Sequence, residues 1–499
     1  MPPAAAVLDV APRNCHSGAG DAPKSVTRGA RSHVVDPPAA HPARDPRPAR
    51  RRPHTPIAVT IGGDEPLAGP DDQTAAGCWP VAVPPWTRAD WLAAGAAVLA
   101  IAGLLTPFLW RCMHGDPGAA CSDYGPHVHV ALAMLHGGII EAYFLYHLTV
   151  ALFAAVPGLA PAPAALLGTL VFHLGLALVV YALTRAALRA WRGPAAAAGA
   201  AAATVALLLV AHGVALDWDT AELYLGFVGI NSYHNPTINA LKPFALLLLP
   251  FASATLAPAA PASAARLAAA AVAAVLSTLA KPSYAICLLP ALGALMLIWT
   301  WRGRPVDWRL GTAVIAPMIA ILAVQYLLTY GGGEGGVAVA PLAVLRLWGA
   351  TDLPLKFLLS ILFPLAVALL FPRQVLASAA LLVSWATFAC GAAFTYLLAE
   401  SGERLAHGNF GWSGEIALFV LFVASTLLVL RIATRPAGRG VRPRLALCGL
   451  AFAVHLVSGV LWYGVHLHLL QGEPFPHVAH LTPPNGAGCF AAAAPDPAA

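Results

Sequence analysis

Two lysines in this chain are each followed by proline at the edge of an apolar run. Lys242 stands in INALKPF, which leads into ALLLLPF, and Lys281 stands in LAKPSY. A charged side chain beside a lipid-like run is costly and marks a functional site or an anchor. Because lysine binds phosphate as a point charge, the pair predicts an anion site, to which His234 and Asn235 would contribute. The alternative is that each lysine only snorkels from a helix end.

A single carboxylate opens the helical stretch CSDYGPHVHVALAMLHGG. Asp123 within hydrogen-bond reach of a hydroxyl would be a general base, and nearby cations would meet the negative charge of a departing phosphate. The alternative is that Asp123 only caps the helix. On a helix Asp123 and His127 share a face but His129 does not, so the spacing is poor for one zinc ion.

A third polar cluster lies in AESGERLAHGNFGW. Arg404 beside carboxylates is suited to orienting a phosphate or a sugar, with His407 next to it. Trp412 would stack on a sugar or, more commonly, sit in the aromatic belt at a membrane surface. The run GGGEGG at 331–336 has no following Gly-Lys, so it predicts a flexible loop over the site and not a nucleotide-binding loop.

The composition shows what must position these residues. The chain has 499 residues, of which 59% are hydrophobic and 10% charged, whereas soluble proteins carry about 25% charged residues. This predicts an all-α, polytopic transmembrane helical bundle. The net charge of +6 is not a nucleic-acid signal, because the arginines stand in short clusters between apolar runs, as cytoplasmic loops do.

About 11 segments are long enough to cross a bilayer. They are 91–110, 164–187, 195–216, 238–256, 265–280, 283–301, 310–330, 354–371, 375–398, 414–431 and 445–466. Basic clusters alternate between their ends so that a cytoplasmic N-terminus and an extracytoplasmic C-terminus fit the positive-inside rule. The segment 143–156 is too short and would break this agreement, so it is predicted to lie along the interface. The expected location is a bacterial-type inner (plasma) membrane.

Three regions follow from this topology. We expect a disordered cytoplasmic segment at 1–85, a transmembrane domain at 86–470 and a flexible tail at 471–499. In the first outer loop, 111–163, Cys112 and Cys121 are predicted to lie close enough for a disulfide. His173 and His212, inside apolar runs, are expected to form hydrogen bonds between helices.

Two interfacial helices in the first outer loop, with an acidic residue at the start of the first, resemble the GT-C superfamily of membrane glycosyltransferases. The residues that carry the resemblance are Asp123-Tyr124 with HVALAMLHGG, and YFLYHLTVALFA, which is similar to the family's second juxtamembrane helix. The chain departs from the family in having one acidic residue before Tyr124, and Glu141-Ala142 where prolines are expected.

The resemblance implies transfer of a sugar from a polyprenyl-phosphate carrier at the extracytoplasmic face, with membrane lipid around the site. It makes Asp123 the catalytic base, and it leaves open a divalent cation beside that residue. The other implied residues contact the substrate phosphate (Lys242, Lys281, His234, Asn235, Arg404) or, more weakly, the rest of the substrate (Tyr124, His127, Glu141, His407, Trp412).

Two other classes remain open. A multispan transporter of an anionic or lipid-linked substrate would also place lysine, histidine and aspartate at a membrane edge. Transporters, however, usually bind near the bilayer midplane on broken helices of repeated halves, and no repeat is evident here. A polysaccharide polymerase or ligase would also be lipid-linked, but 331–353 lacks the density of Arg and His expected of its large outer loop.

Overall fold

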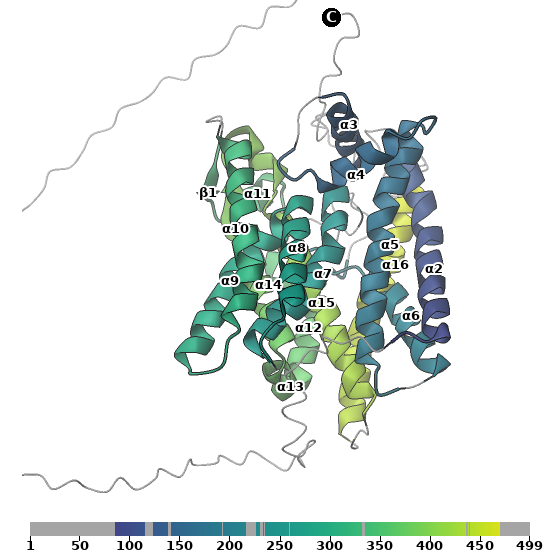
Figure 1. Ribbon diagram of the computed structural model, residues 1–499, viewed down its shortest axis with the longest axis vertical. Helices are drawn as coiled ribbons and strands as arrows, with labels where there is room; N and C mark the ends of the chain where they lie inside the picture. The colour runs from purple at the N-terminus through teal and green to yellow at the C-terminus, as the bar shows by residue number, and fades with distance from the viewer. Residues whose placement is uncertain are drawn as a thin grey trace, which may run out of the picture. The chain divides into compact units, whose positions relative to one another are not determined.

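The computed structural model shows a bundle of apolar α-helices (Figure 1). It describes residues 85–114, 123–137, 141–191, 193–215, 226–229, 233, 235–258, 260–331, 335–435, 438 and 440–469. The predicted N-terminal segment 1–85, except its last residue, and the predicted tail 471–499 lie outside the described residues. Within these residues, sheet is confined to one pair of short strands.

Nine helices of the described residues are long and apolar enough to cross a membrane. They are α2 (Arg88–His114), α5 (Pro161–Ala187), α7 (Pro236–Leu256), α9 (Ser283–Trp301), α10 (Trp308–Tyr330), α12 (Leu353–Leu370), α14 (Ala379–Leu397), α15 (Gly411–Ala433) and α16 (Val441–Leu469). They coincide with nine of the predicted spans, and the chain is a multi-pass membrane protein.

The other two predicted spans, 195–216 and 265–280, form shorter helices. These are α6 (Pro194–Leu209) and α8 (Ala264–Ala280), with 16 and 17 residues. At ~1.5 Å per residue each is about 25 Å long, less than the roughly 30 Å of a bilayer's hydrocarbon core. As helices alone, α6 and α8 are therefore too short to cross the hydrocarbon core of a bilayer.

The prediction that α6 continues to residue 216 is wrong, because the helix ends at Leu209 and residues 210–215 are not helical. Helix α16 supplies hydrogen bonds to this segment: His455 Nδ1 lies 3.0 Å from one of its carbonyl oxygens, and Ser458 Oγ donates to another at 3.1 Å. The backbones can approach because a Cβ at Gly459 would collide with the backbone at Leu209. Non-helical backbone at this depth is stable because it is paired inside the protein.

Helices α7 and α15 lie at the centre of the bundle. Their most apolar windows are 72% and 67% buried inside the protein, more than in any other long helix described. Both nevertheless carry a charged residue, Lys242 in α7 and Glu415 in α15, and both side chains are buried. Charges in such positions need partners, so the middle of the bundle has to supply them.

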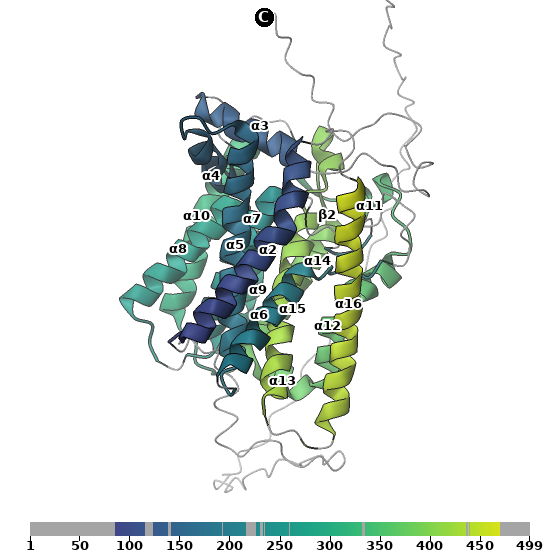
Figure 2. The ribbon, with the colours of Figure 1, turned by 90° about the vertical axis from the view of Figure 1, so that its right-hand side faces the viewer.

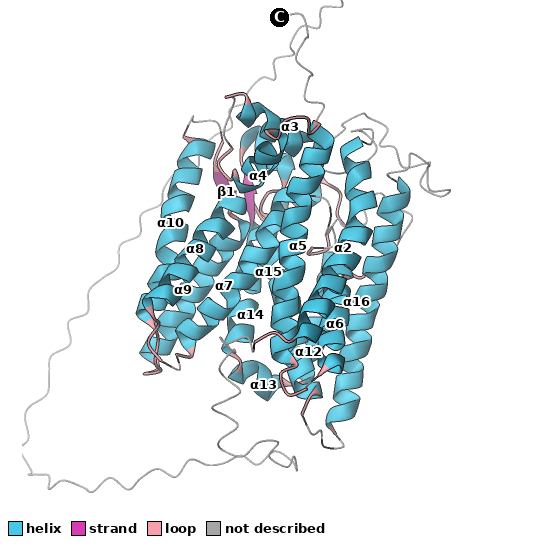
Figure 3. Ribbon diagram, turned by 45° about the vertical axis from the view of Figure 1, so that its right-hand side comes forward, coloured by secondary structure: helices cyan, strands magenta, loops and turns pink. Residues whose placement is uncertain are grey.

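The short elements gather at one end of the bundle (Figures 1 and 3). They are α3 (Tyr124–Leu135), α4 (Leu145–Ala154), α11 (Ala343–Leu347), the 3₁₀ helix η1 (Gly402–His407) and the antiparallel strands β1 (Val337–Val339) and β2 (Leu398–Glu400). The predicted outer loop 331–353 is thus structured in part, because β1 pairs with β2 in a register that puts Val337 opposite Glu400.

The opposite end carries α13 (Pro372–Ala377) and a buried ion pair. Arg185 Nε of α5 donates to Asp90 Oδ1 of α2 at 2.5 Å. The backbone N–H and the hydroxyl of Thr87 both donate to the other oxygen of this carboxylate. Figure 2 shows α2 alongside α5. The pair holds these two helices together at the end remote from α3.

Candidate functional site

Two adjacent residues at the start of α3 each bond to an asparagine of α7. Asn235 Nδ2 donates to Asp123 Oδ2 at 2.6 Å, and Asn239 Nδ2 donates to Tyr124 Oη at 3.4 Å. Because positions 235 and 239 are one helical turn apart, both amides lie on the face of α7 that meets α3. The side-chain oxygen of each asparagine accepts a hydrogen bond from a lysine.

The first chain of contacts ends at Lys281. Lys281 Nζ donates to Asn235 Oδ1 at 3.3 Å and to Thr237 Oγ1 at 3.0 Å. The same Asn235 oxygen caps α7 by accepting the backbone N–H groups of Thr237 and Ile238. One amide therefore holds the Asp123 carboxylate on one side and an ammonium on the other, and the helix cap fixes its position.

The surroundings of Lys281 are aromatic and acidic. The ammonium lies over the rings of Tyr143 and Trp412, 5.5 Å and 5.1 Å from their centres. Trp412, for which the sequence favoured the membrane belt, therefore faces a buried cation. Burial lowers the pKa of Lys281 to about 8, while the charges of Asp123, Glu415 and Glu141 act in the opposite sense. Lys281 is thus still mostly a cation at pH 7.

The second chain of contacts ends at Lys242, inside the bundle. Lys242 Nζ donates to Asn239 Oδ1 at 2.7 Å, lies 4.0 Å from Glu415 Oε1 and faces the Phe419 ring. It lines a cavity that neither Asp123 nor Lys281 lines. Lys242 stands seven positions after Asn235, two turns deeper along the same face of α7, where it meets Glu415 and Phe419 of α15.

Arg404 lies at the edge of this region. Its Nε donates to Glu400 Oε1 at 3.0 Å, and its guanidinium faces the Tyr330 ring, whose hydroxyl donates to the same carboxylate oxygen at 2.7 Å. Burial raises the pKa of Tyr143, and the positive charge of Arg404 opposes that rise. Arg404 is thus near the Lys281 region, while its bond to Glu400 and its contact with the Tyr330 ring hold β2, η1 and α10 together. His407 is exposed on the same short helix.

His127 and His147 form a second pair beside Asp123. His127 Nδ1 and His147 Nε2 are 2.9 Å apart, and His127 Nε2 lies 3.5 Å from Asn235 Nδ2. Burial lowers the pKa of His147 to about 4, so this ring is neutral at pH 7. Among the residues that the structure describes, no group of three or more His, Cys, Asp or Glu side chains is placed to hold a metal ion.

Sequence reasoning missed four residues that the structure adds: Asn239, Tyr143, His147 and Glu415. Two signals were available in the sequence. Asn235 and Asn239 stand four positions apart, on one helix face, and Glu415 interrupts the run SGEIALFVLF with a carboxylate. His234 lies outside the described residues, as does Cys121 of the predicted disulfide.

Comparison of the chain with family models, curated proteins and solved structures finds no match. The chemistry of the site therefore has to come from its own geometry. A carboxylate and an ammonium meet on one amide at the N-terminus of a helix, where the positive end of the helix dipole favours an anion. Such a place can hold a hydroxyl against the carboxylate and a phosphate against the lysine.

Proposed function

We propose that this protein is a membrane glycosyltransferase, similar to the GT-C superfamily, that transfers a sugar from a polyprenyl-phosphate carrier. The observation that carries the proposal is that Asp123 and Lys281 bond to the two ends of the Asn235 amide. The resemblance of the Asp123-Tyr124 segment to the family supports the same assignment. A base and a phosphate-binding cation at the two ends of one amide suit a reaction in which the acceptor hydroxyl attacks a carbon and the phosphate leaves from that same carbon.

In this proposal Asp123 accepts the proton of the acceptor hydroxyl. The acceptor oxygen forms a bond to the anomeric carbon of the sugar, and the bond from that carbon to the phosphate oxygen breaks. The phosphate leaves with the electron pair, and its charge is met by Lys281 and by the N-terminus of α7. Tyr143 and Trp412 flank the ammonium and limit access of water to it.

The proposal includes a topology of about 11 crossings, in which α6 with its extended continuation and α8 also span. Helices α3 and α4 lie along the extracytoplasmic interface of a bacterial-type plasma membrane, and the N-terminus is cytoplasmic. The test is cysteine labelling in intact cells with an impermeant reagent. Cysteine at the exposed position Ser401 should label from outside, and cysteine at the exposed Arg373 only after permeabilisation. The reverse pattern would invert the topology and with it the side on which the site faces.

A transporter of an anionic or lipid-linked substrate is the second candidate. The observation that favours it is the non-helical segment 210–215, which lines a cavity inside the bundle. Unwound backbone beside a buried polar cavity is typical of transporter binding sites. The charged groups at α3 and Lys281, at the end of the bundle, favour the transferase.

Purified protein in nanodiscs, incubated with a panel of labelled polyprenyl-phosphate sugars, distinguishes the two candidates. The transferase should release free polyprenyl phosphate and pass the label to an acceptor or to water, and Asp123→Asn should abolish this. The transporter should instead move a labelled anion or lipid-linked sugar across sealed vesicles, with the donor bond intact. Failure of transfer across the whole panel together with uptake would overturn the proposal.

A further inference from the structure

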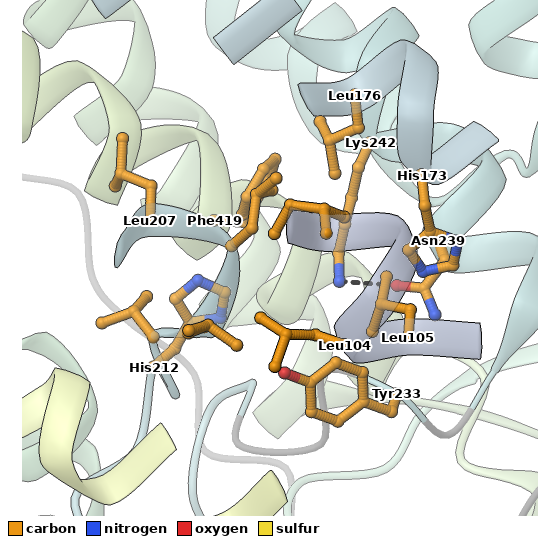
Figure 4. Close-up of a pocket in the computed structure, with 14 residues that line it drawn as sticks. Leu104, Leu105, His173, Leu176, Leu207, His212, Tyr233, Asn239, Lys242 and Phe419 are labelled. Atoms are coloured by element: carbon orange, nitrogen blue, oxygen red, sulfur yellow. Dashed lines mark hydrogen bonds between the residues drawn. The ribbon is translucent and has the colours of Figure 1, made fainter. Parts of the chain in front are cut away.

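Two cavities lie inside the bundle, and they differ in size and lining. The space beside Lys242, shown in Figure 4, is only about 30 Å³, which is room for one or two water molecules. A larger cavity of about 170 Å³ lies between α6, α12, α15 and α16 and is partly open to the outside of the protein. Its walls are alanines of α6, apolar side chains of α12 and α15, and Cys448, Gly449 and Phe452 of α16.

The size and the lining of the larger cavity fit a segment of hydrocarbon chain. Thr426 also lines it, but the hydroxyl of Thr426 donates to the Phe422 carbonyl oxygen. An apolar cavity of about 150 Å³ stays dry and binds a molecule the size of benzene. The cavity here is slightly larger, so it can take a stretch of about six carbons of an alkyl chain. Left empty, its walls would lose the contacts that a filled core provides.

An alkyl chain of the membrane can enter this cavity beside Gly449. Gly449 is exposed although it lines the cavity, and a Cβ at this position would have no atom of the described residues within 4 Å. The nearby Leu447 and Leu450 are 53% and 63% exposed, as expected of a helix face that meets lipid tails. The entrance is therefore on the lipid-facing side of α16.

Arg444 stands one helical turn from the cavity, towards the start of α16. Arg444, Cys448 and Phe452 are spaced four positions apart, so they share one face of the helix, and the last two line the cavity. Helix α16 begins at Val441, and side chains on a helix lean towards its N-terminus. The half-buried Arg444 therefore lies between the cavity and the membrane surface at which α16 begins. With five N–H donors, it can bind a lipid phosphate in addition to a protein group.

Other positive charges lie at the same end of the bundle. Arg189, Arg431 and Arg435 are close enough to interact through their charges, and Arg431 directly follows Leu430, which lines the cavity. Basic residues beside a space between membrane helices favour lipids with a negatively charged head group. The charge around the cavity thus selects among the lipids whose chains its apolar walls would accept.

We propose that this cavity holds part of one acyl chain of an anionic phospholipid and that Arg444 binds the phosphate of the same lipid. The chain enters beside Gly449 and fills the space that the alanines of α6 leave between the four helices. The site lies towards the end of the bundle that carries α13, whereas α3 and Asp123 lie at the other end (Figure 1). It is therefore separate from the proposed transfer and does not depend on it.

The test uses the full chain in phosphatidylcholine nanodiscs that contain a trace of phosphatidylglycerol with a diazirine in its acyl chain. Photolabelling should modify peptides that contain residues 203–206 and 448–452. Phosphatidylcholine with the same diazirine chain should label them at least about fivefold less, the effect of one arginine on an anionic lipid. Unlabelled phosphatidylglycerol should compete and inorganic phosphate should not. Equal labelling by the two probes, competition by inorganic phosphate, or labelling confined to other peptides would overturn the proposal.

Two matched pairs of variants make the test specific. Gly449→Leu places a side chain at the entrance and should abolish labelling of these peptides. Gly464→Leu makes the same change at an exposed glycine of the same helix that does not line the cavity, and it should leave labelling unchanged. Arg444→Gln should weaken labelling by the phosphatidylglycerol probe about fivefold. Arg442→Gln removes the same charge from an exposed position two residues away, on another face of α16, and should not. Equal effects within the arginine pair, or unchanged labelling in a folded Gly449→Leu protein, would refute the assignment.

Discussion

Exchanging the carboxylate and the amide between positions 123 and 235 separates a catalytic role of Asp123 from a structural one. The parent protein has an amide-to-carboxylate hydrogen bond of 2.6 Å between them, and Asn235 also caps α7. The double variant Asp123→Asn/Asn235→Asp reverses the direction of this bond. It keeps the net charge and the cap, because aspartate and asparagine cap helices about equally well. Only the position of the carboxylate changes, from α3 to α7.

The single variants should differ in stability. Asp123→Asn replaces a charge-assisted hydrogen bond with a neutral one and should cost about 1 kcal/mol. Asn235→Asp sets two carboxylates 2.6 Å apart, where their repulsion is about 6 kcal/mol at an effective dielectric constant of ~20. Protonating one carboxyl at pH 7 costs about 4 kcal/mol, less than the repulsion, so the pair takes up a proton. The destabilisation of Asn235→Asp is therefore near 4 kcal/mol or below it, because the positive charge of the adjacent Lys281 offsets part of the repulsion.

The double variant should therefore regain a stability within about 1 kcal/mol of the parent protein. Its transfer rate should stay reduced by about 10²-fold or more, as in Asp123→Asn, because the base no longer lies on the α3 side of the site. The measurements are thermal unfolding in detergent and transfer of labelled sugar from a polyprenyl-phosphate donor. Recovery of transfer together with stability would refute the reasoning, since the carboxylate would then be needed only as half of a pair.

Three further results are expected. Because Lys281, with its pKa of about 8, is charged below that pH and neutral above it, binding of polyprenyl phosphate should weaken between pH 7 and pH 9 in a fluorescence titration, and Lys281→Arg should remove this dependence. Gly459→Ala should lower the melting temperature by several degrees, because its Cβ would meet the backbone beside α6, whereas Gly464→Ala, with open space around it, should not. Ser458→Ala should cost about 1–3 kcal/mol of stability by leaving backbone groups of residues 210–215 unpaired. Ser425→Ala, whose hydroxyl has no partner among the described residues, should cost less; equal losses would contradict the role of Ser458 in pairing this backbone.

The class of the protein and the places of its helices follow from the sequence alone. Apolar runs of about 20 residues identify membrane helices because, in lipid, each helix satisfies its own backbone. The same local reasoning found the start of α3 at Asp123 and the two lysines at the ends of apolar segments. These are properties of single segments, and they do not depend on which segments become neighbours.

The partners of the polar side chains were decided only by the tertiary structure. Asn235 bonds to Asp123 across 112 positions of the chain. The packing of α7 against α15 brings Lys242 to Glu415, whereas Lys281, at the end of α8, meets Asn235. The end of α6 at Leu209 likewise depends on α16, because its His455 and Ser458 supply hydrogen bonds to the non-helical backbone inside the bundle. Such contacts arise from the packing of whole helices against one another, and the spacing of residues within one helix does not determine them.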